Sequence, residues 1–149
     1  MANIEEQAIE TFRSGLNCAQ AVITAYSEKL SFDYNLALSV SCGFGGGMGR
    51  LQETCGAVTG AFMVLGIYNS RKYAENKDRK EKSYAMVREF NQKFTSIYDT
   101  TSCKALLGCD LNTPEGQQFA KEHNVHETIC ERCISDAVNI LEGLMRYEV

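Results

Sequence analysis

One proline, Pro114, occurs among the 149 residues, and no Asn-Gly or Asp-Gly pair stands between alternating apolar runs. Such pairs are the strongest short signals for a β-hairpin, so their absence disfavours a β-rich fold. Basic clusters are missing as well, because 15 Lys and Arg residues face 19 Asp and Glu residues and leave a net charge of −4. Proteins that bind nucleic acid present a basic patch to the phosphates, and we therefore expect no nucleic-acid partner.

The sequence also lacks an apolar run of membrane-spanning length. The longest uncharged apolar stretch, residues 55–68, has 14 residues and includes three glycines, whereas a helix that crosses a bilayer needs roughly 20. We expect this stretch to be a core helix and predict no membrane span. The first residues, Met-Ala-Asn-Ile-Glu-Glu, are acidic and lack the apolar region of a signal peptide, which predicts a cytoplasmic protein.

Several catalytic and nucleotide-binding motifs are absent. No Ser-His-Asp order, pair of buried carboxylates or H-E-x-x-H segment supports a hydrolase. The glycine-rich residues 42–50 fail both nucleotide-binding patterns, because Met48 stands where G-x-G-x-x-G needs its third glycine and no Gly-Lys-Ser/Thr follows. These glycines instead predict positive φ angles and close backbone approach beside Cys55. Arg50, at the end of the segment, either stabilises a nearby thiolate or is a solvated loop charge.

Apolar residues recur at helical spacing through most of the chain and predict an all-α fold. The predicted helices cover residues 2–14, 17–30, 33–41, 55–68, 77–98 and 126–147, with shorter turns at 103–107 and after Thr113 and Pro114. On the longest of these helices, the expected buried stripe consists of Tyr84, Val87, Phe90, Phe94 and Ile97. No repeat or linker divides the chain. We therefore predict one domain, residues 1–149, folded as a bundle of about six helices with a Gly-rich loop before the central helix.

Three cysteines directly follow residues that are expected to cap helix N-termini. The cysteines are Cys18, Cys55 and Cys103, and the expected caps are Asn17, Thr54 and Ser102. At a helix N-terminus, free amide donors and the positive end of the helix dipole stabilise a thiolate and lower the pKa of a thiol. A thiolate is both a nucleophile and a metal ligand. The alternative is that these cysteines only pack in the core, since cysteine is among the most buried residue types.

The last predicted helix brings a second group of reactive side chains together. His126, Cys130 and Cys133 are spaced i, i+4 and i+7, so they share one helical face. The two cysteines form a C-x-x-C pair, which can serve as a dithiol, as half of a zinc site or in an iron–sulfur site. A second pair at zinc-finger spacing is missing, so metal ligands would come from separate helices. His123 and His126 are expected to be solvent-exposed where the helix starts.

Three segments and two later cysteines resemble one known family. The segments are Asn17-Cys18-Ala19-Gln20-Ala21-Val22, Gly45-Gly46-Gly47-Met48-Gly49 and Cys55-Gly56-Ala57-Val58-Thr59-Gly60-Ala61. Together with Cys103 and either Cys130 or Cys133, of which we favour Cys130, they resemble the C_GCAxxG_C_C family of redox-active proteins. The resemblance implies redox activity, inferred for the family from its cysteines and from neighbouring genes for oxidoreductases and transporters. It implies no substrate, and it leaves Cys42 and Cys109 as additional thiols.

The leading hypothesis is thiol–disulfide chemistry centred on Cys55. In this hypothesis Cys55, activated at its helix N-terminus, attacks a substrate or is oxidised, and a second cysteine resolves the product through a disulfide. The candidate resolving thiols are Cys18, Cys103 and Cys130. The protein would then be a thiol–disulfide oxidoreductase.

Two further hypotheses stay open. In the first, zinc or an iron–sulfur cluster makes the protein an electron carrier or sensor. The ligands would be Cys18, Cys55, Cys103 and either Cys130 or Cys133. In the second, the chain is a helical accessory module that docks on an oxidoreductase or transporter. The small residues around Gly56 and Gly60 allow close packing within one chain or between chains, which also leaves a homo-oligomer open.

Overall fold

The first two helices begin at capping residues. In the computed structural model, which describes residues 3–147, α1 (Ile4–Arg13) and α2 (Cys18–Thr24) each start with a reciprocal capping box. In α2, the Gln20 N–H donates to Asn17 Oδ1 over 2.9 Å and the Asn17 N–H donates to Gln20 Oε1 over 3.0 Å. These bonds satisfy amides that have no partner within a helix, and they confirm the predicted cap at Asn17. Residue 2, the first of the predicted helix, lies outside the described residues.

α2 is shorter than predicted because the chain tightens after Thr24. The N–H groups of Tyr26 and Ser27 donate to carbonyls three residues back, at 3.1 Å each, which is 3₁₀ geometry. α3 (Tyr34–Ser41) then begins where the Asp33 carboxylate accepts the Leu36 N–H over 2.6 Å. The predicted cap at Asp33 is therefore confirmed.

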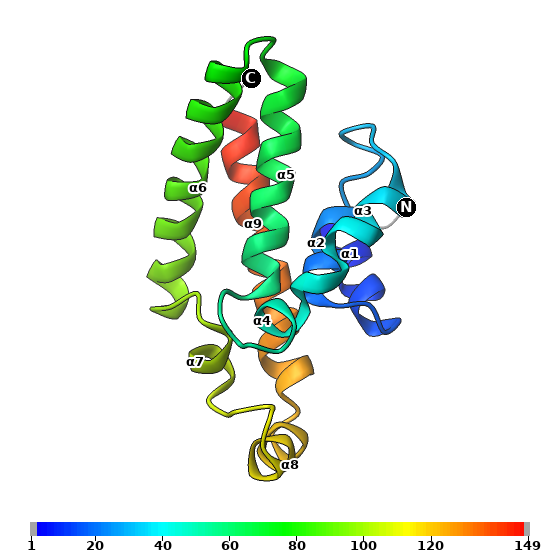
Figure 1. Ribbon diagram of the computed structural model, residues 1–149, viewed down its shortest axis with the longest axis vertical. Coiled ribbons are helices and arrows are strands. Elements are labelled where there is room, and N and C mark those ends of the chain that lie inside the picture. Colours follow the sequence, from blue (N-terminus) through cyan, green and yellow to red (C-terminus); the bar gives the residue numbers. More distant parts are fainter. Residues whose placement is uncertain (1–2, 148–149) are drawn as a thin grey trace.

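Three long helices run side by side at the centre of the molecule: α5 (Gly56–Lys72), α6 (Asn76–Tyr98) and α9 (Glu131–Tyr147) (Figure 1). α2 packs against α5, and α1 packs against α9. Large side chains fill the space between these helices, namely Tyr26, Leu65, Phe90, Phe94, Ile134 and Leu141. Each fully buried apolar side chain of this size contributes about 1.5–3 kcal/mol to stability. This core supports one end of α5, where the site lies.

The buried stripe of α6 is narrower than predicted. Phe90 and Phe94 are fully buried as expected, but Tyr84 and Ile97 keep 54% and 50% of their surface exposed. Met86 takes the third buried position. The four-residue spacing of Met86, Phe90 and Phe94 defines the buried face, and Tyr84 and Ile97 lie off it.

The glycine-rich segment contains a left-handed turn, residues 46–50, where an open loop was predicted. It comprises the short 3₁₀ helix η1 (Cys42–Phe44) and α4 (Gly45–Met48). Gly46, Gly47 and Gly49 have φ values of 63°, 68° and 61°, and Met48 and Arg50 follow them at 69° and 60°. The positive φ values predicted for these glycines are therefore confirmed. For an L-residue, left-handed helical backbone costs about 1–2 kcal/mol, so Met48 and Arg50 are strained positions.

The remaining elements lie at one end of the bundle (Figure 1). They are α7 (Cys103–Leu107), α8 (Pro114–Glu122) and η2 (His126–Cys130). η2 is a turn of π-helix, in which the Glu131 N–H donates to the His126 carbonyl five residues back. The last predicted helix, 126–147, is therefore present but begins with a wider turn before it continues as α9.

The all-α prediction is confirmed. Residues 3–147 form no strand, and their isolated β-bridge joins Thr54 to Ser102. The predicted bundle helices correspond to α1, α2, α3, α5, α6 and α9, which the short α4, α7, α8 and η2 connect. Within the same range, no helix has both the length and the apolar character that crossing a membrane requires.

Candidate functional site

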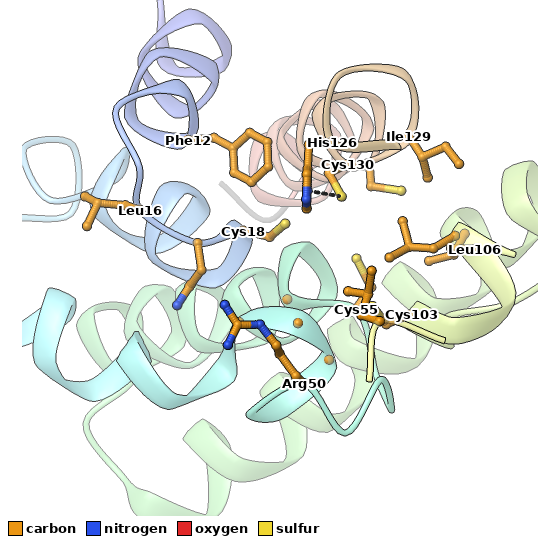
Figure 2. A pocket seen from close by; sticks show the side chains of 18 of the residues that line it. Phe12, Leu16, Cys18, Arg50, Cys55, Cys103, Leu106, His126, Ile129 and Cys130 are labelled. Carbon is orange, nitrogen blue, oxygen red and sulfur yellow. Dashed lines mark hydrogen bonds between the residues drawn. The ribbon is translucent and has the colours of Figure 1, made fainter. Parts of the chain in front are cut away.

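Cysteine side chains from separate elements meet at one cavity of about 840 Å³ (Figure 2). Those that line it are Cys18, Cys42, Cys55, Cys103, Cys130 and Cys133. Figure 2 shows Cys18 and Cys130 with His126 on one side of the cavity, and Cys55 with Cys103 on another. The structure therefore brings together all five cysteines that the sequence singled out. Cys109 lies outside this lining, packed against the small cluster around Leu107.

Close packing of α2 on α5 positions Cys18 beside Cys55. A Cβ atom on Gly56 would lie 3.1 Å from the Cys18 Cβ and 3.0 Å from the Ala19 backbone nitrogen. A Cβ atom on Gly60 would lie 2.8 Å from the Ala19 carbonyl oxygen. Only glycine permits these approaches. The small-residue face thus packs within the chain.

The helix start at Cys55 differs from the prediction. Asn17 and Ser102 cap the helices of Cys18 and Cys103 as expected. Thr54, however, does not cap α5, because Cys55 is itself the N-cap residue and Thr54 forms the β-bridge with Ser102. The Cys55 thiol consequently lies at the first free amides of the helix, where it is closer to them than a thiol on the first helical residue would be.

The β-bridge holds Cys55 and Cys103 next to each other. On one side of it, the Cys55 N–H donates to the Thr101 carbonyl over 2.7 Å. On the other, the Cys103 N–H donates to the Glu53 carbonyl over 2.6 Å. Gly47 lets the left-handed turn pack closely against Cys103, since a Cβ atom on residue 47 would lie 2.7 Å from the Cys103 Cβ. Backbone bonds and glycine packing together fix this side of the cavity.

Cys18 and Cys130 form the first of two thiol pairs. Both side chains are partly buried, and a hydrogen bond from the Cys18 S–H to the Cys130 sulfur raises the pKa of Cys18 and lowers the pKa of Cys130. His126 Nδ1 lies 3.8 Å from Cys130 Sγ and lowers the pKa of this thiol further, to about 6. The same contact raises the pKa of His126. At neutral pH, Cys130 is therefore a thiolate paired with a histidine.

His126 is exposed, as predicted for both histidines, but it belongs to the site while His123 does not. The ring of His123 stacks on Phe119 at a centroid distance of 4.0 Å, and its Nδ1 lies 2.9 Å from the Phe119 carbonyl oxygen. The i, i+4 spacing of His126 and Cys130 is the sequence signal that distinguishes the two histidines. Their difference arises in η2, which carries His126 and Cys130 on one side of a single turn.

Replacing His126 by alanine should move the reactivity profile of Cys130 to higher pH. Without the adjacent imidazolium, the thiolate loses one donor and one positive neighbour, so the pKa of Cys130 rises and its alkylation at pH 5 slows about threefold. His123→Ala is the matched control, because His123 does not contact the cavity thiols. Initial rates with iodoacetamide between pH 4.5 and 8.5 measure the midpoint. An identical midpoint in both variants would show that His126 does not stabilise the thiolate.

Cys55 and Cys133 form the second, deeper pair. Only 7% of Cys55 and 1% of Cys133 are exposed. A hydrogen bond from the Cys133 S–H, together with the N–H groups of Ala57 and Val58, lowers the pKa of Cys55. Donation to Cys55 and burial raise the pKa of Cys133. The C-x-x-C motif thus joins the two pairs, with Cys130 in one and Cys133 in the other.

The three other cysteines, Cys42, Cys103 and Cys109, belong to neither thiol pair. Cys103 is 8% exposed, and burial, together with the nearby Cys55, raises the pKa of Cys103 to about 12. Cys42 is exposed at the rim of the cavity. Burial and the adjacent Asp110 raise the pKa of Cys109. The raised pKa values of Cys103 and Cys109 disfavour both as nucleophiles.

Sequence reasoning did not identify two polar side chains near the cysteines. Gln52 is 4% exposed, and its amide donates to the Cys109 carbonyl over 2.9 Å and accepts the Leu111 N–H over 2.7 Å. These bonds fold residues 109–111 back onto the left-handed turn. Tyr98 donates to Asp136 over 2.5 Å and lies close enough to Cys133 to influence the pKa of that thiol. Neither residue belongs to a sequence motif, and both act through contacts between distant segments.

The thiols of the site stand as two pairs with Cys103 beside them. Within residues 3–147, no three His, Cys, Asp or Glu side chains are arranged to hold a metal ion. The ligand set predicted for zinc therefore shares a cavity but is not positioned around one point. A tetrahedral zinc site needs four ligands at about 2.0–2.3 Å from the metal.

A comparison with protein families agrees with the cysteine pattern. Residues 16–144 match a family model described as "Putative redox-active protein (C_GCAxxG_C_C)". The matched span contains all seven cysteines and both histidines. No curated protein and no solved structure matches the chain significantly.

Proposed function

Since the chain belongs to the C_GCAxxG_C_C family of redox-active proteins, we propose that it carries out thiol–disulfide exchange with Cys130 as the attacking thiolate. The observation that carries this proposal is the contact of Cys130 with Cys18 and His126 at the cavity. Cys55, the attacking thiol in the sequence-based hypothesis, is less accessible than Cys130. We therefore assign Cys55 to the buried pair.

The reaction requires no component beyond a disulfide and the first thiol pair. The Cys130 thiolate attacks one sulfur of a disulfide, a new S–S bond forms, and the second half of the disulfide leaves as a thiolate that takes the Cys18 proton. The Cys18 thiolate then attacks the Cys130 sulfur and releases the first half as a second thiolate. The substrate disulfide gains two electrons, and Cys18 and Cys130 lose two as they form a disulfide.

The second pair provides an internal acceptor for that disulfide. Cys133 follows Cys130 by three residues on the same helix and already contacts Cys55. Cys133 would pass its proton to the Cys55 thiolate that it contacts and attack the Cys130 sulfur, which breaks the Cys18–Cys130 bond and releases Cys18 as a thiolate. Cys55 would then give this proton to Cys18 and attack Cys133, which forms the Cys55–Cys133 bond and releases Cys130 as a thiolate. These exchanges move the disulfide into the core and regenerate the thiolate at the cavity. This gives Cys55 and Cys133 a role that suits their burial.

In a Cys42→Ser background, the additional changes Cys18→Ser and Cys133→Ser are expected to trap a mixed disulfide on Cys130. Neither serine can resolve the adduct, so intact mass spectrometry after reaction with glutathione disulfide should show a stable glutathione adduct. Cys42→Ser alone, which removes only an exposed rim thiol, should instead lose two hydrogens and retain no adduct. Cys42→Ser with Cys133→Ser is the control and should behave in the same way, because Cys18 is still present. Equal loss of the adduct in this control and in the triple variant would eliminate Cys18 as the resolving thiol.

Elemental analysis tests the metal–thiolate alternative. Several cysteines converge on one cavity, which is the observation in favour of this alternative, although they are not arranged around one ion. Stoichiometric zinc, or iron with acid-labile sulfide, in protein purified without oxygen would favour it over dithiol chemistry. Metal-free protein with a reactive Cys130 would favour exchange. Docking on an oxidoreductase or transporter stays a prediction.

A further inference from the structure

Two of the three basic side chains that line the cavity, Arg13 and His126, contact a neighbouring group, and Arg50 does not. Arg13 donates to both oxygens of Glu131, at 2.7 and 3.0 Å, and Glu127 adds to the negative charge around Arg13. His126 lies beside the Cys130 sulfur. Among the residues that the structure describes, no hydrogen bond or ion pair engages the Arg50 guanidinium. One cation of the wall is thus available to a ligand.

The backbone of Arg50 is fixed although its side chain is free. Its carbonyl accepts the Asn112 side-chain amide over 2.7 Å, and its N–H donates to the Gly45 carbonyl over 3.3 Å. The side chain lies across Gly46, where a Cβ would come within 2.8 Å of the Arg50 Cγ. Figure 2 shows the guanidinium directed into the cavity on the side of Cys18. The side chain of Arg50 thus extends into the cavity. Its direction is determined by the positive φ of Arg50, by its contact with Gly46 and by the two backbone hydrogen bonds.

The rest of the wall limits the kind of molecule that fits. Apolar side chains also line the cavity, namely Phe12, Leu16, Leu106, Leu107, Leu111 and Ile129. Small-molecule pockets typically measure about 300–1,000 Å³ and combine an apolar lining with a few polar groups. The cavity, at about 840 Å³, falls within this range. It can hold a compact organic molecule next to Cys130.

We propose that the cavity binds small organic disulfides that carry a carboxylate, with Arg50 as the residue that binds the carboxylate while Cys130 attacks the disulfide. The proposal rests on the exchange function above and names the substrate class of the same site. Guanidinium and carboxylate form charge-assisted, often bidentate hydrogen bonds. Arg50 would hold one end of the molecule and the apolar wall its middle, which places the S–S bond at Cys130. The bonds formed and broken, and the two electrons transferred, are those of the exchange between a disulfide and the Cys18–Cys130 pair described above.

Paired disulfide reagents of different charge test this assignment. Dithiobis(nitrobenzoate) carries carboxylates, and dithiodipyridine is a neutral aromatic disulfide. Initial rates of both are measured on the full-length wild-type protein, on Arg50→Gln and on Arg50→Lys at pH 5 and low salt, where Cys130 is expected to dominate the reaction. We expect Arg50→Gln to slow the anionic reagent about threefold relative to the neutral one, and Arg50→Lys to restore most of the difference. Added salt should reduce the preference of wild type for the anionic reagent.

Arg88→Gln is the matched control, because it changes net charge equally at an exposed position of α6 remote from the cavity. Circular dichroism establishes that the Arg50 variants fold. If Arg50→Gln slows both reagents equally, Arg50 acts on the thiolate and the proposal is wrong. If the ratio changes as much in Arg88→Gln, the preference reflects net charge and the proposal is also wrong. Should Cys130→Ser leave both rates unchanged, the exchange function itself fails, which is a separate outcome.

Discussion

Replacing Cys130 by serine should lower the rate of the reaction with dithiodipyridine at pH 5 by about 20-fold. With the pKa of Cys130 at about 6, about 9% of this thiol is ionised at pH 5. An ordinary thiol of pKa about 8.5 is only about 0.03% ionised there. The advantage in thiolate concentration is about 300-fold, and the weaker nucleophilicity of a less basic thiolate reduces it by about 13-fold.

The same argument predicts how the effect disappears. Near pH 7 the two opposing factors leave about a twofold advantage, and by pH 8.5 a thiol of ordinary pKa reacts faster than Cys130. The effect of Cys130→Ser is therefore large in acid and small in base. Cys42→Ser, the control, removes an exposed thiol and should leave the rate at pH 5 unchanged. A Cys130→Ser variant whose rate at pH 5 equals that of wild type would mean that Cys130 is not the activated thiol.

Alanine at Gly60 and alanine at Gly66 should change stability in opposite directions, although both glycines lie inside α5. At Gly60, the new Cβ would be 2.8 Å from the Ala19 carbonyl oxygen, so α2 and α5 must separate, and we expect a loss of about 1–2 kcal/mol. At Gly66, no atom lies within 4 Å of the new Cβ. Alanine is the better helix former and should add about 0.5–1 kcal/mol.

Urea denaturation of the three proteins measures this difference, which should amount to about 1.5–3 kcal/mol between the variants. Because Gly60 sets the distance between α2 and α5, Gly60→Ala should also disturb the Cys18–Cys130 pair and slow thiol reactivity at pH 5. Gly66→Ala should leave that reactivity unchanged. Equal stability of the two variants would show that the close approach at Gly60 relaxes without cost.

Local sequence signals predict most of the fold. Caps at Asn17, Asp33 and Ser102 follow from residue types that bond to the first amides of a helix, and the apolar periodicity of Phe90 and Phe94 indicates their face. Such signals are contained within a few neighbouring residues. They therefore predict which segments form helices. They are less able to predict where a helix starts or ends when contacts with distant segments determine that boundary.

Contacts between distant segments account for the features that the sequence does not predict. Thr54 has the side chain of a cap, but its backbone pairs with Ser102, and Cys55 takes the cap position as a result. The sequence also left open whether Cys130 or Cys133 belongs to the site. Both do, because η2 presents Cys130 to Cys18 and α9 presents Cys133 to Cys55. The apolar neighbours of Cys133 at helical spacing were a signal for its burial.

The π-helical turn of η2 makes the chemistry of the site depend on the length of the chain. A π-turn contains one residue more than an α-turn. If one residue between His126 and Cys130 were missing, this stretch would close as a regular α-turn and the helix on either side would keep its register, because the π-turn is what accommodates the additional residue. His126 would then precede Cys130 by three residues instead of four and would meet the sulfur in a different geometry, although no cysteine or histidine had changed. The low pKa of Cys130 is thus encoded in the number of residues in one turn as well as in their identity.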